Sequence, residues 1–234
     1  TPRVRVAYFQ MGKFQYRKSD YSKAIQWFEK VNKWNLTRDE LAEYYFKMAF
    51  SYYSLGELEK SDKLFYELID QENKYSVPAI YYYSHIEYLN GNFETALNGF
   101  SKLKSDPTFS FIVPYYLSQI YFLQKKYDLV IEYIPGVLDS AVSKRMPEMA
   151  KILGQAYYRT EKYEMAIKYL EKYRDKTSGF TRDDSYDLGI SYYKTGIYDK
   201  AAELLQIVTN ADDQYTQYAY YYLADCYLKK GEKE

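Results

Sequence analysis

The feature of this sequence that most constrains its fold is a pattern that returns about every 35 residues. One column of the pattern holds small side chains and a single valine, and the intervals between its members are 37, 35, 34, 36 and 35 residues. A bulky apolar residue stands four positions after each member. Such self-similarity predicts stacked units that each bury surface against the next. The small column is Ala24, Ser61, Ala96, Val130, Ala166 and Ala201, and the bulky column is Phe28, Phe65, Phe100, Ile134, Leu170 and Leu205.

A second column of small residues precedes the first by 12 positions. Two helices that cross closely need a small side chain at the crossing, with bulky side chains filling the space around it. Each unit is therefore predicted to be a pair of antiparallel helices, with one small column on each helix. The members of this first-helix column are Gly12, Ala49, Ser84, Ser118, Gly154, Gly189 and Ala224.

Two units share the sequence Leu-Gly-x-x-Tyr, at 153–157 and 188–192, with a small residue nine positions later. This pattern resembles the tetratricopeptide repeat, whose period is about 34 residues, and the chain is similar to bacterial proteins with many such repeats. The resemblance implies an all-α fold, a right-handed superhelical solenoid of about six helical hairpins plus a final unpaired helix. A single solenoid is expected over residues 1–234, cut from a longer protein, with repeats at about 5–38, 39–74, 76–108, 109–140, 146–178 and 181–212 and a partial repeat at 213–234.

Prolines mark the fourth unit as irregular. Pro135 falls inside its second helix, where proline removes a backbone donor and clashes with the preceding turn. We expect that helix to end early or kink, and the segment from Asp139 to Met146 to be irregular. Pro114 falls in the opening turn of a first helix, where proline is tolerated.

Charge and composition exclude several kinds of function. Lys and Arg number 32, as do Asp and Glu, and a net charge of zero argues against a nucleic acid partner, because that affinity rests on many cationic contacts. With one cysteine, Cys226, and one histidine, His85, the chain has no internal disulfide and no Cys/His metal cluster. No segment reaches the roughly 18 consecutive apolar residues of a membrane helix. We therefore predict no catalytic residue, metal, cofactor or transmembrane segment, and no enzymatic activity.

Two residues with reactive side chains receive structural interpretations. His85 has Tyr81 and Tyr88 as its neighbours on the predicted helix, which favours a stacked or hydrogen-bonded histidine over a catalytic base. Cys226 shares a column with Ser51, Ala156 and Ser191, and is predicted to be a buried filler without an activating group.

The resemblance also implies that the first helix of each hairpin lines a concave face that binds partners. The chain holds 33 tyrosines, and aromatic rings bind at low entropic cost because they have few rotatable bonds. The same register places Phe9 and Ile190 on this face. The candidate partner-binding residues are Phe46, Phe50, Tyr53, Tyr81, His85, Tyr88, Tyr115, Gln119, Phe122, Lys151, Gln155 and Arg159.

Four functions are compatible with such a fold. The first is a scaffold that binds a peptide or protein on the concave, aromatic-rich face. The alternative is a helical-repeat protein that binds a small ligand or glycan on aromatic platforms. RNA binding by repeats that each read one base needs recurring polar pairs, which this sequence lacks. The fourth is a non-catalytic module attached to an enzyme.

Some relatives bind a C-terminal carboxylate through a set of Lys, Asn and Arg side chains, and this sequence lacks that set.

The last helix carries Tyr218, Tyr220, Tyr221, Tyr222 and Leu223 without a second helix to cover them. This exposed apolar surface predicts self-association through the C-terminal helix, or burial by further chain. By resemblance to exported repeat proteins, the bacterial periplasm or cell envelope is the expected location.

The register of the columns is testable at Gly189. Replacing Gly189 with leucine should overpack the predicted helix crossing, which costs roughly 1–3 kcal/mol or more. Thermal unfolding followed by circular dichroism measures the effect. An unchanged melting temperature would contradict the register.

Overall fold

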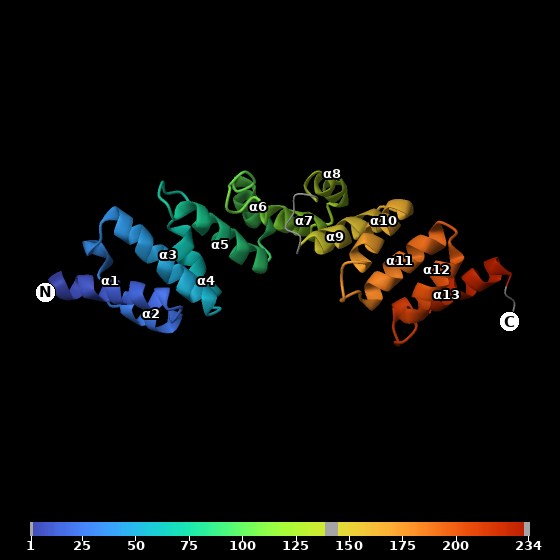
Figure 1. The fold of residues 1–234 in the computed structure, drawn as a ribbon, viewed down its shortest axis with the longest axis horizontal. Coiled ribbons are helices and arrows are strands. Elements are labelled where there is room, and N and C mark those ends of the chain that lie inside the picture. The colour runs from blue at the N-terminus through green and yellow to red at the C-terminus, as the bar shows by residue number, and fades with distance from the viewer. Residues whose placement is uncertain (1, 139–144, 232–234) are drawn as a thin grey trace. The chain divides into compact units, whose positions relative to one another are not determined.

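The computed structural model describes residues 2–138 and 145–231, and within them the chain is entirely helical (Figure 1). It forms thirteen α-helices and one short 3-10 helix in these ranges, with no strand. This confirms the predicted all-α helical-repeat fold. The helices are α1 Pro2–Arg17, α2 Tyr21–Phe28, α3 Arg38–Ser54, α4 Leu58–Tyr66, α5 Ser76–Leu89, α6 Phe93–Lys102, α7 Val113–Leu123, α8 Tyr127–Val137, α9 Met146–Arg159, α10 Tyr163–Arg174, α11 Arg182–Lys194, α12 Tyr198–Val208 and α13 Gln214–Lys230, with the 3-10 helix at Lys33–Asn35.

The chain divides into two compact units, Thr1–Phe109 and Ser110–Glu234. In the first unit α1 pairs with α2, α3 with α4 and α5 with α6. In the second unit α7 pairs with α8, α9 with α10 and α11 with α12, and α13 packs on α11 and α12. Each first helix also packs on the second helix before it within its unit, as α3 does on α2 and α11 on α10. No helix in the described ranges is long and apolar enough to cross a membrane.

The small columns lie where the paired helices cross. A Cβ atom added at Gly12 would lie 2.5 Å from the Phe28 ring, and one at Gly154 would lie 2.8 Å from Leu170 Cγ. At Gly189 the same atom would lie 3.1 Å from Leu205 Cγ. Each of these three glycines therefore faces the bulky residue of its own second helix. The fully buried bulky column fills the space that the small column leaves open.

Serine replaces glycine or alanine at some crossings, and its hydroxyl is hydrogen-bonded to a nearby backbone carbonyl. Ser84 and Ser118 each donate to the backbone carbonyl four residues earlier, at 2.6 and 2.7 Å. Ser61 donates instead to the Ala49 carbonyl of the facing helix, at 2.8 Å. A buried hydroxyl that is hydrogen-bonded in this way costs little, so small polar residues serve in these columns.

One turn geometry joins the two helices in all six hairpins. In each turn a single residue has a positive φ, and the next residue donates its N–H to the carbonyl five residues back, at 2.8–3.0 Å. Glycine is favoured in this left-handed conformation, yet half of these positions hold other residues. The six left-handed residues are Ser19, Gly56, Gly91, Lys125, Glu161 and Gly196.

The fourth hairpin is more regular than predicted. Helix α8 continues past Pro135 to Val137, so the predicted early end is wrong. Pro135 lies in the last turn with an exposed side chain, next to the fully buried Ile134 that anchors the helix. Met146 begins α9 and is not part of an irregular segment, while residues 139–144 lie outside the described ranges. Pro114 is the second residue of α7, as predicted.

Paired glycine substitutions separate crowding at a crossing from helix propensity. In Gly154→Ala the new methyl group would lie 3.0 Å from the Leu170 backbone nitrogen, which cannot move freely, so we expect a loss of roughly 1–3 kcal/mol in unfolding free energy. In the control Gly136→Ala, in α8, the new methyl group would have no neighbour within 4 Å. Its free energy of unfolding should therefore rise by up to about 1 kcal/mol, because alanine has the higher helix propensity. Urea unfolding of both variants checks this, and equal effects would refute crowding as the reason for glycine at position 154.

Candidate functional site

Three predicted aromatic residues of the first unit, Phe46, Phe50 and Tyr53, lie within one continuous cluster of rings. We call Tyr16, Tyr21, Phe46, Phe50, Tyr53, Phe65, Tyr75 and Tyr82 the aromatic cluster. Phe46 stacks on Tyr75 with ring centroids 5.1 Å apart, and Phe50 meets Tyr82 edge-on at 5.2 Å. Phe65 is fully buried, whereas the other members are half-buried. The cluster is thus partly core and partly surface.

Tyr82 is the member that sequence reasoning missed, and it lies at the centre. Its ring contacts those of Phe46, Phe50, Tyr53 and Phe65, from helices α3 and α4, at 5.0–6.3 Å. It stands two positions before the small residue Ser84, in a column that holds glutamine, lysine, tyrosine, isoleucine or aspartate in the other repeats. The tyrosine run 81–83 was the available signal. Only packing shows which tyrosine of the run points into the cluster.

His85 is hydrogen-bonded and stacked, as predicted. Its Nδ1 lies 2.8 Å from the Tyr53 hydroxyl, and its ring is nearly parallel to that of Tyr81. Tyr81 in turn stacks on Phe109 at 4.5 Å, and Tyr88 meets Phe93 at 6.1 Å. Burial lowers the pKa of His85, which favours its neutral form. The arrangement joins the second and third hairpins.

Two lysines and one glutamate lie beside the aromatic cluster. The Glu43 carboxylate lies 2.6 Å from Lys47 and 3.5 Å from Lys13, and the Lys47 ammonium lies over the Tyr16 ring at 5.2 Å. All three charged side chains are at most 20% exposed. Burial raises the pKa of Glu43, but the two ammonium groups lower it by more. These charges link α1 to α3 and hold the rings of the cluster in place.

The candidates on α7 and α9 lie in the second unit. Gln119 donates to the Tyr115 hydroxyl at 3.2 Å, and Phe122 meets the Tyr127 ring at 5.5 Å. The Lys151 ammonium lies 2.7 Å from Asp184, and the Gln155 amide donates to Asp187 at 3.4 Å. Five candidate side chains on these helices are half-buried: Tyr115, Gln119, Phe122, Lys151 and Gln155.

The repeat register did not predict the surroundings of Arg159, Asp184 and Asp187. Arg159 is exposed, with its guanidinium over the Tyr158 ring at 5.3 Å. Asp184 and Asp187 on α11 are buried and receive the polar side chains of α9, a role that sequence reasoning missed. Two other placements were wrong, because Phe9 and Ile190 are 2% and 4% exposed and belong to the core. Both lie on first helices, but their apolar side chains turn toward neighbouring helices.

Asp187 has the most strongly shifted pKa among the acidic residues of α9 and α11. It is 4% exposed, and among the described residues no lysine or arginine lies within ion-pair distance of its carboxylate. Burial raises the pKa of Asp187 to about 6, and the charge of Arg159 opposes this only in part. A carboxylate buried without a close counter-ion is costly, so Asp187 destabilises the α9–α11 contact when it is ionised.

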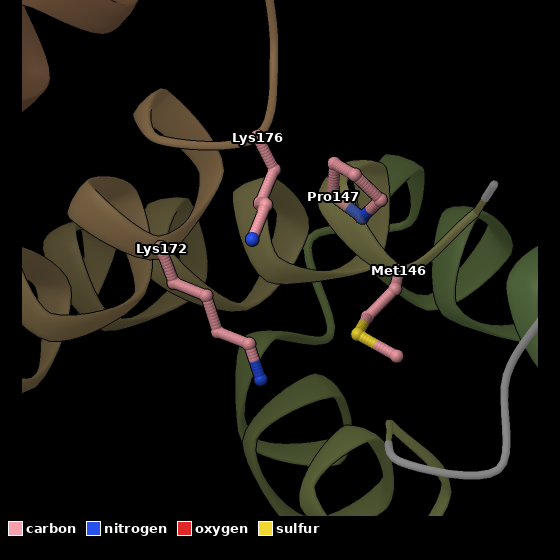
Figure 2. Close-up of a pocket in the computed structure, with 4 residues that line it drawn as sticks. All are labelled: Met146, Pro147, Lys172 and Lys176. Carbon is pink, nitrogen blue, oxygen red and sulfur yellow. The ribbon is translucent and has the colours of Figure 1, made fainter. Parts of the chain in front are cut away.

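A cavity of about 260 Å³ lies elsewhere in the second unit (Figure 2). It lies between the start of α9 and the end of α10, lined by Met146, Pro147, Lys172 and Lys176. None of the predicted site residues lines it. Within the described residues there is also no group of three or more His, Cys, Asp or Glu that could hold a metal ion. Cys226 is buried, and burial raises the pKa of its thiol, so the thiol is not activated.

Sequence comparison identifies the repeat along much of the chain. Three family models described as "Tetratricopeptide repeat" match it, one over residues 186–234, one over 6–37 and 152–173, and one over 43–72. These segments fall in both units. No curated protein sequence matches the chain.

Solved structures share the fold at low sequence identity. The C-terminal part of a TPR repeat-containing protein from Cytophaga hutchinsonii is 16% identical with a TM-score of 0.62, over 93% of this chain and 95% of that one. PilF of Pseudomonas aeruginosa is 16% identical with a TM-score of 0.64, over 93% and 96% of the two chains. YrrB, described as a TPR protein with an unusual peptide-binding site, is 16% identical with a TM-score of 0.63, over 77% and 92%.

The buried Asp187 predicts a dependence of stability on pH. The pKa of the Asp187 carboxyl in the folded state lies above its ordinary value of 3.8, so the folded state binds this proton more tightly than the unfolded state does. The stability that this proton contributes to the folded state is therefore lost as pH rises from about 4 through 6. Asp187→Asn removes this loss, so the variant should be more stable than the parent at pH 7.5, by roughly 1–3 kcal/mol, and by much less at pH 4.5. Urea unfolding at both pH values measures the difference. The exposed neighbour Asp183→Asn is the control, and a pH-independent effect of Asp187→Asn would contradict this account.

Proposed function

Because this chain belongs to the tetratricopeptide repeat family, we propose that it is a scaffold that binds a peptide or protein segment along its first helices, without turnover. The aromatic cluster carries the proposal. It offers half-buried rings that are already held by one another, so a partner's apolar side chain would bind without ordering flexible residues. YrrB, which shares the fold, is described as having a peptide-binding site, and that description supports the same class of partner here.

Each of the two units offers its own kind of surface to a partner. In the first unit, Phe46, Phe50 and Tyr53 would contact apolar side chains of the partner, with His85 and Tyr88 at the next hairpin. In the second unit, the charged and amide groups of Lys151, Gln155 and Arg159 would contact polar groups. Lys151 and Gln155 already engage Asp184 and Asp187, so they would add less affinity than the aromatic cluster of the first unit.

Binding of a glycan is the weaker alternative. Sugar recognition by aromatic residues needs flat ring faces that are open to solvent. In the aromatic cluster many faces are taken by other rings, as in the stacked pairs Phe46–Tyr75 and Phe65–Tyr82. Ring edges and the gaps between rings remain, and these suit branched aliphatic or aromatic side chains of a peptide better than a sugar ring.

Selection from a displayed peptide library tests the proposal. With the whole chain as bait, we expect enrichment of peptides that carry at least one large apolar residue. The enriched peptide should bind at least about tenfold more weakly to Phe46→Leu/Phe50→Leu, which keeps apolar volume but removes both rings. Isothermal titration calorimetry measures the affinities, and circular dichroism checks that the variant is folded.

The control for this experiment removes an aromatic ring outside the cluster. Trp34 is 86% exposed in the 3-10 helix, so Trp34→Leu should bind the peptide as the parent does. Failure to enrich any peptide would refute a peptide-binding scaffold. Equal affinity for the parent and a folded Phe46→Leu/Phe50→Leu variant would place the binding site elsewhere on the chain.

A further inference from the structure

The cavity between α9 and α10 is lined by two lysines and by two apolar side chains. Met146 and Pro147 are the first two residues of α9, Lys172 lies in the last turn of α10, and Lys176 follows that helix by two residues. In Figure 2 the two lysine side chains reach the cavity from the α10 side, and Met146 and Pro147 lie opposite them on α9. The cavity therefore belongs to one hairpin, whose two helices pack closely on each other.

Lysine at both positions is a property of this hairpin and not of the repeat. Lys172 and Lys176 stand two and six positions after Leu170, a member of the bulky column. No other hairpin has two cations at these distances, so the repeat fold forms without them. The corresponding pairs are Lys30 and Trp34, Glu67 and Gln71, Lys102 and Asp106, Gly136 and Ser140, and Ile207 and Ala211.

The ammonium groups of Lys172 and Lys176 form no ion pair with any acidic residue in the described ranges. The neighbouring carboxylate of Glu171 is already paired with Arg174, at 2.7 Å. Two like charges four residues apart repel each other when nothing lies between them. An anion between the two ammonium groups would turn this repulsion into attraction.

The start of α9 adds to the positive potential of the cavity. The first turn of a helix has backbone N–H groups without a helical partner and carries the positive end of the helix dipole. The acidic residue of this turn, Glu148, is paired with Arg145 at 3.6 Å and does not line the cavity. An anion that enters would therefore meet two unpaired ammonium groups and a helix N-terminus.

The size and the walls of the cavity indicate the kind of anion. Its volume of about 260 Å³ is below the roughly 300–1,000 Å³ of pockets for drug-sized ligands, so the ligand has few heavy atoms and is smaller than a peptide segment. Two ammonium groups suit the two oxygens of a carboxylate. The side chains of Met146 and Pro147 offer carbon atoms to an alkyl chain, whose removal from water is favourable.

We propose that this cavity binds a small carboxylic acid with a short alkyl chain. The carboxylate lies between Lys172 and Lys176, and the chain lies against Met146 and Pro147. The site uses no residue of the aromatic cluster, so it stands or falls independently of peptide binding.

NMR titration of the whole chain, labelled at its methionine methyl groups, tests the proposal with hexanoate as the probe. Of the five methionines, Met146 lines the cavity, and the variant Met146→Leu assigns its signal. Hexanoate should shift the Met146 signal until it saturates, and should leave the signal of the exposed Met11 on α1 unchanged. Hexanamide has nearly the same shape but no charge, so it should bind at least about tenfold more weakly.

Paired lysine variants test the role of the two charges. Lys172→Gln/Lys176→Gln should weaken hexanoate binding at least about tenfold, because both charged partners of the carboxylate are lost. The matched control Lys162→Gln/Lys168→Gln removes two exposed cations of the same hairpin that do not line the cavity, and it should bind as the parent does. Lysines near a helix C-terminus also stabilise the helix through its dipole, so circular dichroism checks that the first variant is folded.

Three results would overturn the proposal. The first is a Met146 signal that does not respond to hexanoate, or that responds only in parallel with Met11, since binding would then be absent or non-specific. The second is equal affinity for hexanoate and hexanamide. The third is unchanged affinity in a folded Lys172→Gln/Lys176→Gln variant, because the lysines would then not hold the ligand.

Discussion

The close crossing of two helices at a small side chain is the contact on which the rest of this structure depends. At Gly12, Gly154 and Gly189 the facing residue of the second helix lies 2.5, 2.8 and 3.1 Å from where a Cβ atom would be, so the close approach of the helices depends on the absence of that atom. Once that distance is set, the bulky column is fully buried and the turn between the helices takes one geometry throughout. Each hairpin then leaves two surfaces uncovered, which it buries against its neighbours.

Packing between neighbouring first helices determines which side chains remain for a partner. In the first unit, rings from α1 to α5 pack on one another, with Lys13, Glu43 and Lys47 beside them. In the second unit, side chains of α9 reach the buried carboxylates of α11. A large part of the predicted binding face therefore stabilises the stack itself. In each unit, the side chains that form these contacts are held in fixed positions.

The predictions that proved wrong have two causes. Phe9 and Ile190 were assigned to the open face by their place in the repeat, but each is an apolar side chain within reach of a neighbouring helix, and burial wins. We expected the helix to end early or kink at Pro135, but it continues to Val137, because Pro135 lies in the last turn, where few further hydrogen bonds depend on the missing N–H. A register states which residues are equivalent, while the neighbours of each residue differ from one repeat to the next.

The sequence by itself determined that the chain is helical, that its helices pair, and where each pair crosses, because these features follow from side-chain size repeated at a constant interval. It also located His85 and the aromatic residues of α3 and α5 close together. Only the tertiary structure decided that Tyr82 is the centre of the aromatic cluster and that Asp187 is buried. These outcomes depend on contacts between residues some 30 positions apart, where a few degrees of helix rotation decide which side chain is buried, and no local pattern encodes that rotation.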